Sequence, residues 1–282
     1  MKKNNSISSK GIINQLNTNG YCIVNSFIDD KKCYRLKNII QMLSSKLQAN
    51  KNYQDERTKQ GQVIVRDIQL RSPENFLSLI DQKLIMDVLK KLFNDKFILD
   101  NCMASNSINV NKHHSSLVHI DSHLPSKNIE LTSDVVVMYC FDDFKKQNGA
   151  TKVWPKSHLS GVRIQDDKDY KKKIRKKYKY VEAKKGSIVF FLGQTWHQIG
   201  INSSNQSRWG LLCHYKRWWI KPSTDFTKCG NKIFKKLNLK QKELFGFNSI
   251  SPSFNFISKT RNLKTLRNIK KISNEYYKVI SY

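Results

Sequence analysis

Three side chains that could bind one metal ion stand in two motifs far apart in the sequence. His119 and Asp121 are two residues apart in LVHID, so on a strand both would point to the same face. His197 follows an apolar run and the turn that ends it. Two neutral imidazoles and one carboxylate leave positions open on an Fe(II) ion, where a chelating 2-oxo acid and dioxygen can bind. We therefore expect His119, Asp121 and His197 to be metal ligands of a catalytic centre.

An arginine follows the last of these three residues by a short interval. Arg208 follows His197 by eleven residues, across a turn rich in Asn and Ser. This spacing predicts that His197 and Arg208 lie on adjacent strands. The planar donor fork of a permanently charged guanidinium suits the far carboxylate of a dicarboxylic acid.

The N-terminal third predicts helices that support a sheet. Residues 10–48 are typical of a helix, a strand and a helix that begins with acidic residues. Residues 62–70 (QVIVRDIQL) predict a second strand, and residues 74–93 have the apolar spacing of one amphipathic helix.

From about residue 97 the apolar pattern changes to that of strands. Short runs such as SDVVVMYCFDDF, GSIVFFLG and RWGLLCHYKRWW are separated by Gly, Asn, Ser and Pro. Strands at this density predict a sandwich or barrel, so the fold class is mainly β with α.

Together these motifs resemble the phytanoyl-CoA dioxygenase family of Fe(II)/2-oxoglutarate oxygenases, over about residues 16–222. The resemblance rests on NTNGYCIVNSFI, on the His119 and Asp121 pair, on NGATKVWPKSH, on KKGSIVFFLGQTWH and on Arg208. It implies a double-stranded β-helix (jelly-roll, cupin-like) core, with Fe(II) on His119, Asp121 and His197. It also implies that 2-oxoglutarate is anchored by Arg208, that dioxygen is the co-reactant, and that Thr151 and Trp154 lie near the cosubstrate.

The sequence departs from the family pattern at two places. Ser122 and His123 follow the metal Asp, which affects the fit of the substrate. Gly210 stands where some relatives carry a hydroxyl two residues beyond the Arg, which removes one contact to the cosubstrate.

The other histidines and tryptophans are open to simpler interpretations. We expect His158 to hold a loop by hydrogen bonding, since a fourth protein ligand would fill an open coordination position. His113 and His114 could face the substrate or the solvent, and His123 is the alternative metal ligand if its strand continues. Trp196 is the tryptophan best placed to contact the substrate, although aromatic residues in barrel strands mostly pack.

The resemblance implies hydroxylation of an unactivated C–H bond of a small metabolite, with 2-oxoglutarate converted to succinate. Related halogenases have a small neutral residue at the position of Asp121, so the carboxylate favours hydroxylation. Two alternatives are a non-oxidative jelly-roll metalloenzyme and a basic protein that binds nucleic acid or other anions on a degenerate oxygenase fold. The interval between His197 and Arg208 argues against the first, and an intact set of ligands argues against the second.

The length of 282 residues suits one domain. We expect a core over about residues 97–222, an N-terminal support over 1–96 and a basic C-terminal extension over 223–282. The six cysteines show no CxxC pair, which favours free thiols. No apolar stretch has the length of a signal peptide or a membrane span, so the sequence predicts a cytoplasmic protein.

The formal charge of +29 indicates either an anionic partner or a lysine-rich codon bias. Seven of the nine residues from Lys171 to Lys179 are basic. Lys outnumbers Arg about fourfold, whereas surfaces that grip phosphates favour Arg, so nucleic acid is disfavoured. An anionic or thioester-linked substrate is the functional interpretation of this charge.

Overall fold

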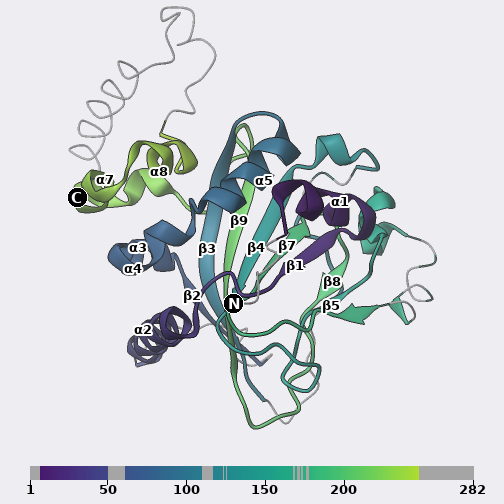
Figure 1. The fold of residues 1–282 in the computed structure, drawn as a ribbon, viewed down its shortest axis with the longest axis horizontal. Helices are drawn as coiled ribbons and strands as arrows, with labels where there is room; N and C mark the ends of the chain where they lie inside the picture. The colour runs from purple at the N-terminus through teal and green to yellow at the C-terminus, as the bar shows by residue number, and fades with distance from the viewer. Residues whose placement is uncertain are drawn as a thin grey trace, which may run out of the picture.

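Two antiparallel sheets face each other, and helices cover the outer face of the larger one (Figure 1). The computed structural model describes residues 7–49 and 61–109, residues 117–167 apart from 123 and 125, and residues 169–247 apart from 170, 171, 173, 176 and 177.

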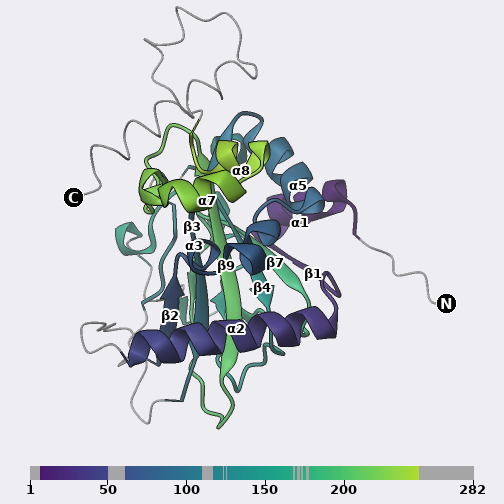
Figure 2. The same ribbon diagram turned by 90° about the vertical axis from the view of Figure 1, so that its left-hand side faces the viewer.

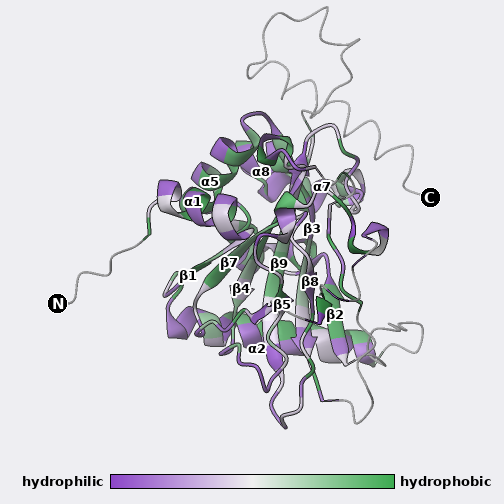
Figure 3. Cartoon of the chain, turned by 90° about the vertical axis from the view of Figure 1, so that its right-hand side faces the viewer, coloured by the Kyte–Doolittle hydropathy of each residue, from purple (hydrophilic) through white to green (hydrophobic). Residues whose placement is uncertain are grey.

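The larger sheet has six strands in the order β1-β7-β4-β9-β3-β2. The strands are β1 (Tyr21–Val24), β2 (Gln62–Arg66), β3 (Phe97–Ser107), β4 (Asp134–Cys140), β7 (Ile188–Leu192) and β9 (Arg208–Arg217). The smaller sheet has the order β6-β5-β8, with β5 (Lys152–Val153), β6 (Lys179–Tyr180) and β8 (His197–Gln198). Figure 3 shows β5 and β8 in front of β4 and β9. This arrangement is the expected double-stranded β-helix.

Alternate residues of the central strands pack in two different cores. Val135 and Val137 of β4 face the helices, where they pack with helix residues such as Leu36. Val136 lies between the two sheets, in a cluster that includes Val153 of β5. The inner faces of the sheets therefore enclose the interior of the barrel.

The helices cover one face of the larger sheet (Figure 2). They are α1 (Ser9–Asn19), α2 (Asp30–Gln48), α3 (Ile68–Arg71), α4 (Pro73–Phe76), α5 (Lys83–Phe93), α7 (Gly230–Lys236) and α8 (Leu239–Leu244). The predicted helix, strand and helix over residues 10–48 are confirmed. The second helix begins after Asp29, whose side chain accepts a hydrogen bond from the backbone N–H of Lys32.

The prediction of one helix over residues 74–93 was wrong. The segment forms α4, a 3-10 turn over Leu77–Leu79 and then α5. Two buried tyrosines of the sheet explain the break, because Tyr139 donates its hydroxyl hydrogen to the Leu79 carbonyl and Tyr215 donates to the Ile80 carbonyl, at 2.6 and 2.7 Å. A continuous α-helix would use these two carbonyls for its own backbone.

The predicted strand over residues 62–70 ends early. β2 stops at Arg66, and Asp67 takes a left-handed backbone conformation with φ of 52°. Aspartate tolerates this conformation better than most residues, and the chain then turns into α3.

The start of the expected C-terminal extension, as far as residue 247, packs on the core. Phe226, Phe234 and Leu244 are buried in the cluster between the helices and the larger sheet. Residues 248–282 lie outside the described part. Among the residues that the structure describes, no helix is long and apolar enough to cross a membrane.

Candidate metal centre and cosubstrate pocket

His119 and His197 are brought together by a backbone bridge between segments far apart in the sequence. The N–H of each residue donates to the carbonyl of the other, at 2.9 and 3.0 Å. Directly paired residues on antiparallel strands point to the same face. The two imidazole rings accordingly lie with their centroids 4.3 Å apart.

The Asp121 carboxylate lies close to the Nε2 atoms of both rings. Its Oδ1 is 3.9 Å from Nε2 of His119, and its Oδ2 is 3.6 Å from Nε2 of His197. The candidate ligand atoms of the three residues all lie within 4.8 Å of one another. The structure thus brings together the three residues that the sequence pointed to.

The outer nitrogens of both rings are fixed by hydrogen bonds. Nδ1 of His119 lies 2.9 Å from the Leu117 carbonyl, and Nδ1 of His197 lies 3.0 Å from the Thr195 carbonyl. A carbonyl can only accept, so in a neutral ring Nδ1 carries the hydrogen and Nε2 carries the lone pair. Nε2 of both rings then lies on the Asp121 side, which is the arrangement that metal-binding histidines use.

A glycine fixes the backbone that carries Asp121. The Gly193 carbonyl accepts hydrogen bonds from the N–H groups of Asp121 and Ser122, at 2.8 and 2.9 Å. The Gly193 N–H donates in turn to the Asp134 carbonyl at 2.7 Å. A Cβ atom at residue 193 would lie 2.5 Å from Cβ of Asp134, so only glycine allows this approach.

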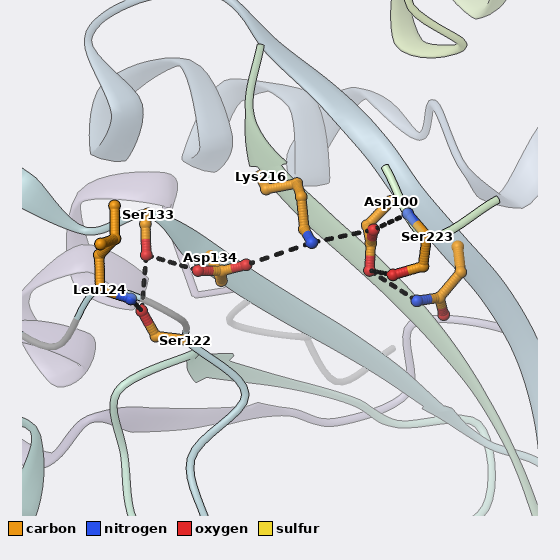
Figure 4. Close-up of polar contacts among 8 residues, drawn as sticks. Asp100, Ser122, Leu124, Ser133, Asp134, Lys216 and Ser223 are labelled. Atoms are coloured by element: carbon orange, nitrogen blue, oxygen red, sulfur yellow. Dashed lines mark hydrogen bonds and ion pairs between the residues drawn. The ribbon is translucent and has the colours of Figure 1, made fainter. Parts of the chain in front are cut away.

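A buried chain of polar side chains extends from this backbone (Figure 4). The Ser122 and Ser133 hydroxyls are 2.6 Å apart, and Ser133 donates to the Asp134 carboxylate. Lys216, which is 4% exposed, joins Asp134 to Asp100, with its Nζ at 3.9 and 2.9 Å from their carboxylates. Sequence reasoning missed this network, because nothing in the pattern marks a strand lysine as buried.

The surroundings of Asp121 favour its charged form. Burial would raise the pKa of Asp121, but His197, His214, His119 and Lys216 together lower it. The carboxyl group is therefore ionised at neutral pH, as a metal ligand must be.

Arg208 lies in the barrel interior, on β9. The residue is 4% exposed, its Nη2 donates to the Gly149 carbonyl at 2.7 Å, and its guanidinium lies 4.2 Å from the centre of the Phe144 ring. Burial lowers the pKa of Arg208 to about 10, so the group remains charged at neutral pH. Its Nε is buried and has no hydrogen-bond partner within the described ranges. A buried charge with a free donor fits an anionic ligand.

The prediction that His197 and Arg208 lie on adjacent strands was wrong. His197 belongs to β8 in the smaller sheet, whereas Arg208 begins β9 between β3 and β4 in the larger sheet. The intervening turn crosses from one sheet to the other, so the two residues approach the barrel interior from opposite walls.

Thr151 and Trp154 point to opposite faces of the smaller sheet. Val153 is paired with His197 and packs in the inner cluster, so Thr151 shares its inner face by alternation. Trp154 points the other way and packs with Trp196 and Ile164. Trp154 therefore packs on the opposite face from Val153, and its place relative to the cosubstrate stays a prediction.

Trp196 and His158 are both buried, and each forms a hydrogen bond to a backbone carbonyl. The Trp196 indole is 3% exposed and donates its N–H to the Val162 carbonyl at 3.2 Å. His158 is fully buried, with Nε2 at 3.0 Å from the Asn17 carbonyl, so it holds a loop as expected. Three other histidines lie outside the described residues: His113, His114 and His123.

Two polar residues that the sequence did not single out line the interior close to the metal ligands. Asn101 of β3 and His214 of β9 are cross-strand partners, and His214 also pairs with Val136 of the inner cluster. Oδ1 of Asn101 and Nε2 of His214 are buried without a hydrogen-bond partner among the residues described. Burial lowers the pKa of His214, although Asp121 and Asp100 oppose this, so its imidazole is neutral at neutral pH.

The exposure of the ligands shows which end of the site is open. The His119 side chain is 46% exposed, the Asp121 side chain 22% and the His197 side chain 16%. Arg208 is almost completely buried at 4%. Among the described residues, the His119 end of the site is therefore the more exposed one and the Arg208 end the more buried.

Comparisons with protein families and with curated proteins each give a match. The family model described as Phytanoyl-CoA dioxygenase (PhyH) matches residues 16–210. The uncharacterized protein YJR154W of Saccharomyces cerevisiae is 22% identical over 267 residues, which cover 86% of this chain and 75% of that protein.

Solved structures with the same fold include those of SnoK, SnoN and HygX. The alpha ketoglutarate dependent carbocyclase SnoK has a TM-score of 0.62 at 16% identity, over 81% of this chain and 90% of its own. The epimerase SnoN, solved with Fe3+, alpha ketoglutarate and nogalamycin RO, has 0.60 at 17%, over 76% and 86%. HygX from Streptomyces hygroscopicus, solved with nickel, 2-oxoglutarate and hygromycin B, has 0.60 at 10%, over 74% and 88%. At these identities the likeness shows the fold.

Proposed function

Because the chain belongs to the phytanoyl-CoA dioxygenase family, we propose that it is an Fe(II)- and 2-oxoglutarate-dependent dioxygenase that hydroxylates a C–H bond of a small molecule. The observation that carries the proposal is the convergence of His119, Asp121 and His197, with both histidine Nε2 atoms turned towards the carboxylate.

His119, Asp121 and His197 would hold the iron on one face and leave the other positions open. Bound iron would supply the activation of dioxygen, coupled to the oxidative decarboxylation of 2-oxoglutarate to succinate and carbon dioxide. The protein residues orient the ligands and exclude water. The carbonyls of Leu117 and Thr195 keep the two imidazoles in the tautomer that binds a metal.

Arg208 would bind the distal carboxylate of 2-oxoglutarate. The Gly149 carbonyl and the Phe144 ring hold the Arg208 side chain, so its guanidinium is already oriented before the ligand binds. Its burial strengthens the attraction for a carboxylate, because little water screens the pair.

The Asp121 carboxylate supports hydroxylation as the outcome. It fills the coordination position that a halogenase would leave for chloride. The structural relatives include an epimerase and a carbocyclase, so the outcome for this chain is decided by analysis of its product. Gain of one oxygen atom by the substrate identifies hydroxylation, loss of two hydrogens identifies cyclisation, and unchanged mass identifies epimerisation.

The walls of the site support a small polar substrate. Asn101 and His214 each present a buried polar atom without a partner in the described part of the chain. His214 is close enough to Asp121 to affect its pKa, and Asn101 is the cross-strand partner of His214. A substrate hydroxyl or amide group could bond to both, whereas an alkyl chain would leave them unsatisfied at a cost of ~1–3 kcal/mol each. The basic surface supports an anionic or thioester-linked substrate as well, and four residues of the Lys171–Lys179 run (171, 173, 176 and 177) lie outside the described residues.

The experiment is a measurement of succinate formation by purified protein given Fe(II), ascorbate, 2-oxoglutarate and oxygen. We expect iron-dependent succinate formation that His197→Ala abolishes and that a true substrate raises. Succinate formed equally by wild type and His197→Ala, or none at any iron concentration, would overturn the proposal.

A further inference from the structure

Two buried polar atoms in the Arg208 pocket have no hydrogen-bond partner. They are Nε of Arg208 and the Ser107 hydroxyl, and neither bonds to another residue that the structure describes. Ser107 is fully buried. Buried hydroxyls without a partner are rare in proteins, so each one calls for a ligand or a water molecule.

The two atoms belong to neighbouring side chains. Ser107, the last residue of β3, is the direct cross-strand partner of Arg208, the first residue of β9. Paired residues have Cβ atoms ~4.5–5.5 Å apart on the same face of the sheet. The hydroxyl therefore lies on the inner face beside the guanidinium.

Gly149 brings the two groups towards one point. Its carbonyl accepts a hydrogen bond from Nη2 of Arg208, and it has a positive φ of 84°. A Cβ atom at this position would lie 2.5 Å from Oγ of Ser107. The serine hydroxyl, the guanidinium and the glycine backbone thus surround one small space.

Position 210, where some members of the family carry a hydroxyl, is crowded in this chain. A Cβ atom on Gly210 would lie 3.0 Å from the Phe144 ring, which itself packs on Arg208. Gly210 is paired with Ser105, whose hydroxyl already accepts a hydrogen bond from Gln62 at 2.9 Å. Of the two β3 serines, Ser107 is the one whose hydroxyl is buried without a hydrogen-bond partner among the described residues.

We propose that Ser107 donates a hydrogen bond to the distal carboxylate of 2-oxoglutarate and so replaces the hydroxyl that Gly210 lacks. This inference rests on the proposed function, because it needs 2-oxoglutarate at Arg208. A buried carboxylate has about four acceptor sites, and one guanidinium that already donates to Gly149 leaves some of them open. The Ser107 hydroxyl supplies a further charge-assisted donor from the neighbouring strand.

The test is calorimetric titration of Co(II)-loaded wild type and Ser107→Ala with two ligands, 2-oxoglutarate and oxalate. Oxalate chelates the metal but has no distal carboxylate. We expect Ser107→Ala to weaken 2-oxoglutarate binding by roughly tenfold or more, as for other hydrogen bonds to charged groups. Oxalate binding should be unchanged within about twofold.

A matched control is Ser105→Ala, which removes a hydroxyl two residues away on the same face. It should leave the affinity for both ligands close to that of wild type. A second readout is the melting temperature without ligand. Loss of an unpaired buried hydroxyl should leave this temperature unchanged or raise it, whereas a structural hydroxyl would lower it.

The outcomes separate this inference from the proposed function. If wild type binds neither ligand when loaded with metal, the proposed function and this inference fall together. If wild type binds 2-oxoglutarate and Ser107→Ala binds it equally well, the inference alone is overturned. Equal loss of 2-oxoglutarate and oxalate binding, or a clearly lower melting temperature, also overturns it, because each shows a structural role.

Discussion

His119 and His197 exchange both backbone hydrogen bonds, at 2.9 and 3.0 Å, so two of the proposed metal ligands are direct cross-strand partners. This backbone pairing alone fixes the separation of the two rings, so no metal ion is needed to bring them together. Asp121, two residues beyond His119, completes the set from the same segment. The site is thus preformed by backbone geometry.

Removing one of the paired ligands should weaken metal binding severely. We expect His197→Ala to lower the affinity for Fe(II) or Co(II) by more than the roughly 10–100-fold that loss of an outer hydrogen-bond partner costs. Competition with a coloured chelator measures this affinity. Arg208→Lys is the control, since Arg208 lies at the other end of the pocket and should not change it.

Arg208→Lys should act on the cosubstrate instead. Lysine replaces a planar fork with a point charge and loses the stacking on Phe144. We expect 2-oxoglutarate to bind at least roughly tenfold more weakly, about 1.4 kcal/mol, with little change in metal affinity. The dissociation constant of the metal-loaded protein tests this, and an unchanged value would remove Arg208 from the cosubstrate pocket.

Lys216→Met should destabilise the fold. Lys216 is 4% exposed and is paired with Asp100 and Asp134, so its loss leaves two buried carboxylates without their cation. Removing one partner of a buried ion pair typically costs ~3–5 kcal/mol. Urea unfolding measures the change. The double variant Lys216→Met/Asp100→Asn should recover part of the loss, and strict additivity of the two changes would argue against the network.

His158 should make stability depend on pH. Burial lowers the pKa of His158 below its ordinary value of 6.5, against an opposing hydrogen bond to the Asn17 carbonyl. Below about pH 6.5 the unfolded chain therefore binds more protons than the folded protein, and stability falls as the pH is lowered. We expect a smaller loss of unfolding free energy between pH 7 and 5 in His158→Gln. His214, whose pKa is also lowered, should keep part of the slope. Equal slopes in wild type and variant would contradict the assignment to His158.

Much of the site could be predicted from the sequence because its parts are local motifs. The two-residue interval between His119 and Asp121 gives a shared face on any extended segment. The placement of Arg208 relative to His197 could not be predicted, because the spacing does not reveal whether a turn stays within one sheet or crosses to the other. Sheet pairing fixes that relationship over long range.

The missed elements depend on contacts between distant segments. The predicted helix over residues 74–93 breaks where Tyr139 and Tyr215 take two of its carbonyls, and those tyrosines lie about 60 and 135 residues further along the chain. Lys216 and Asp134 are ordinary strand residues in the sequence and become a buried pair only when β4 and β9 align in register. In the same way, Ser107 becomes a candidate ligand-binding residue only because the sheet pairs it with Arg208.

The proposed metal centre is tested most directly by a crystal structure of the protein grown with Mn(II) and 2-oxoglutarate, with the metal located by anomalous scattering. We expect one metal site per chain, about 2.0–2.2 Å from Nε2 of His119, Nε2 of His197 and an oxygen of Asp121. We also expect the distal carboxylate of 2-oxoglutarate at Arg208. A metal bound elsewhere, or 2-oxoglutarate turned away from Arg208, would contradict the proposed site.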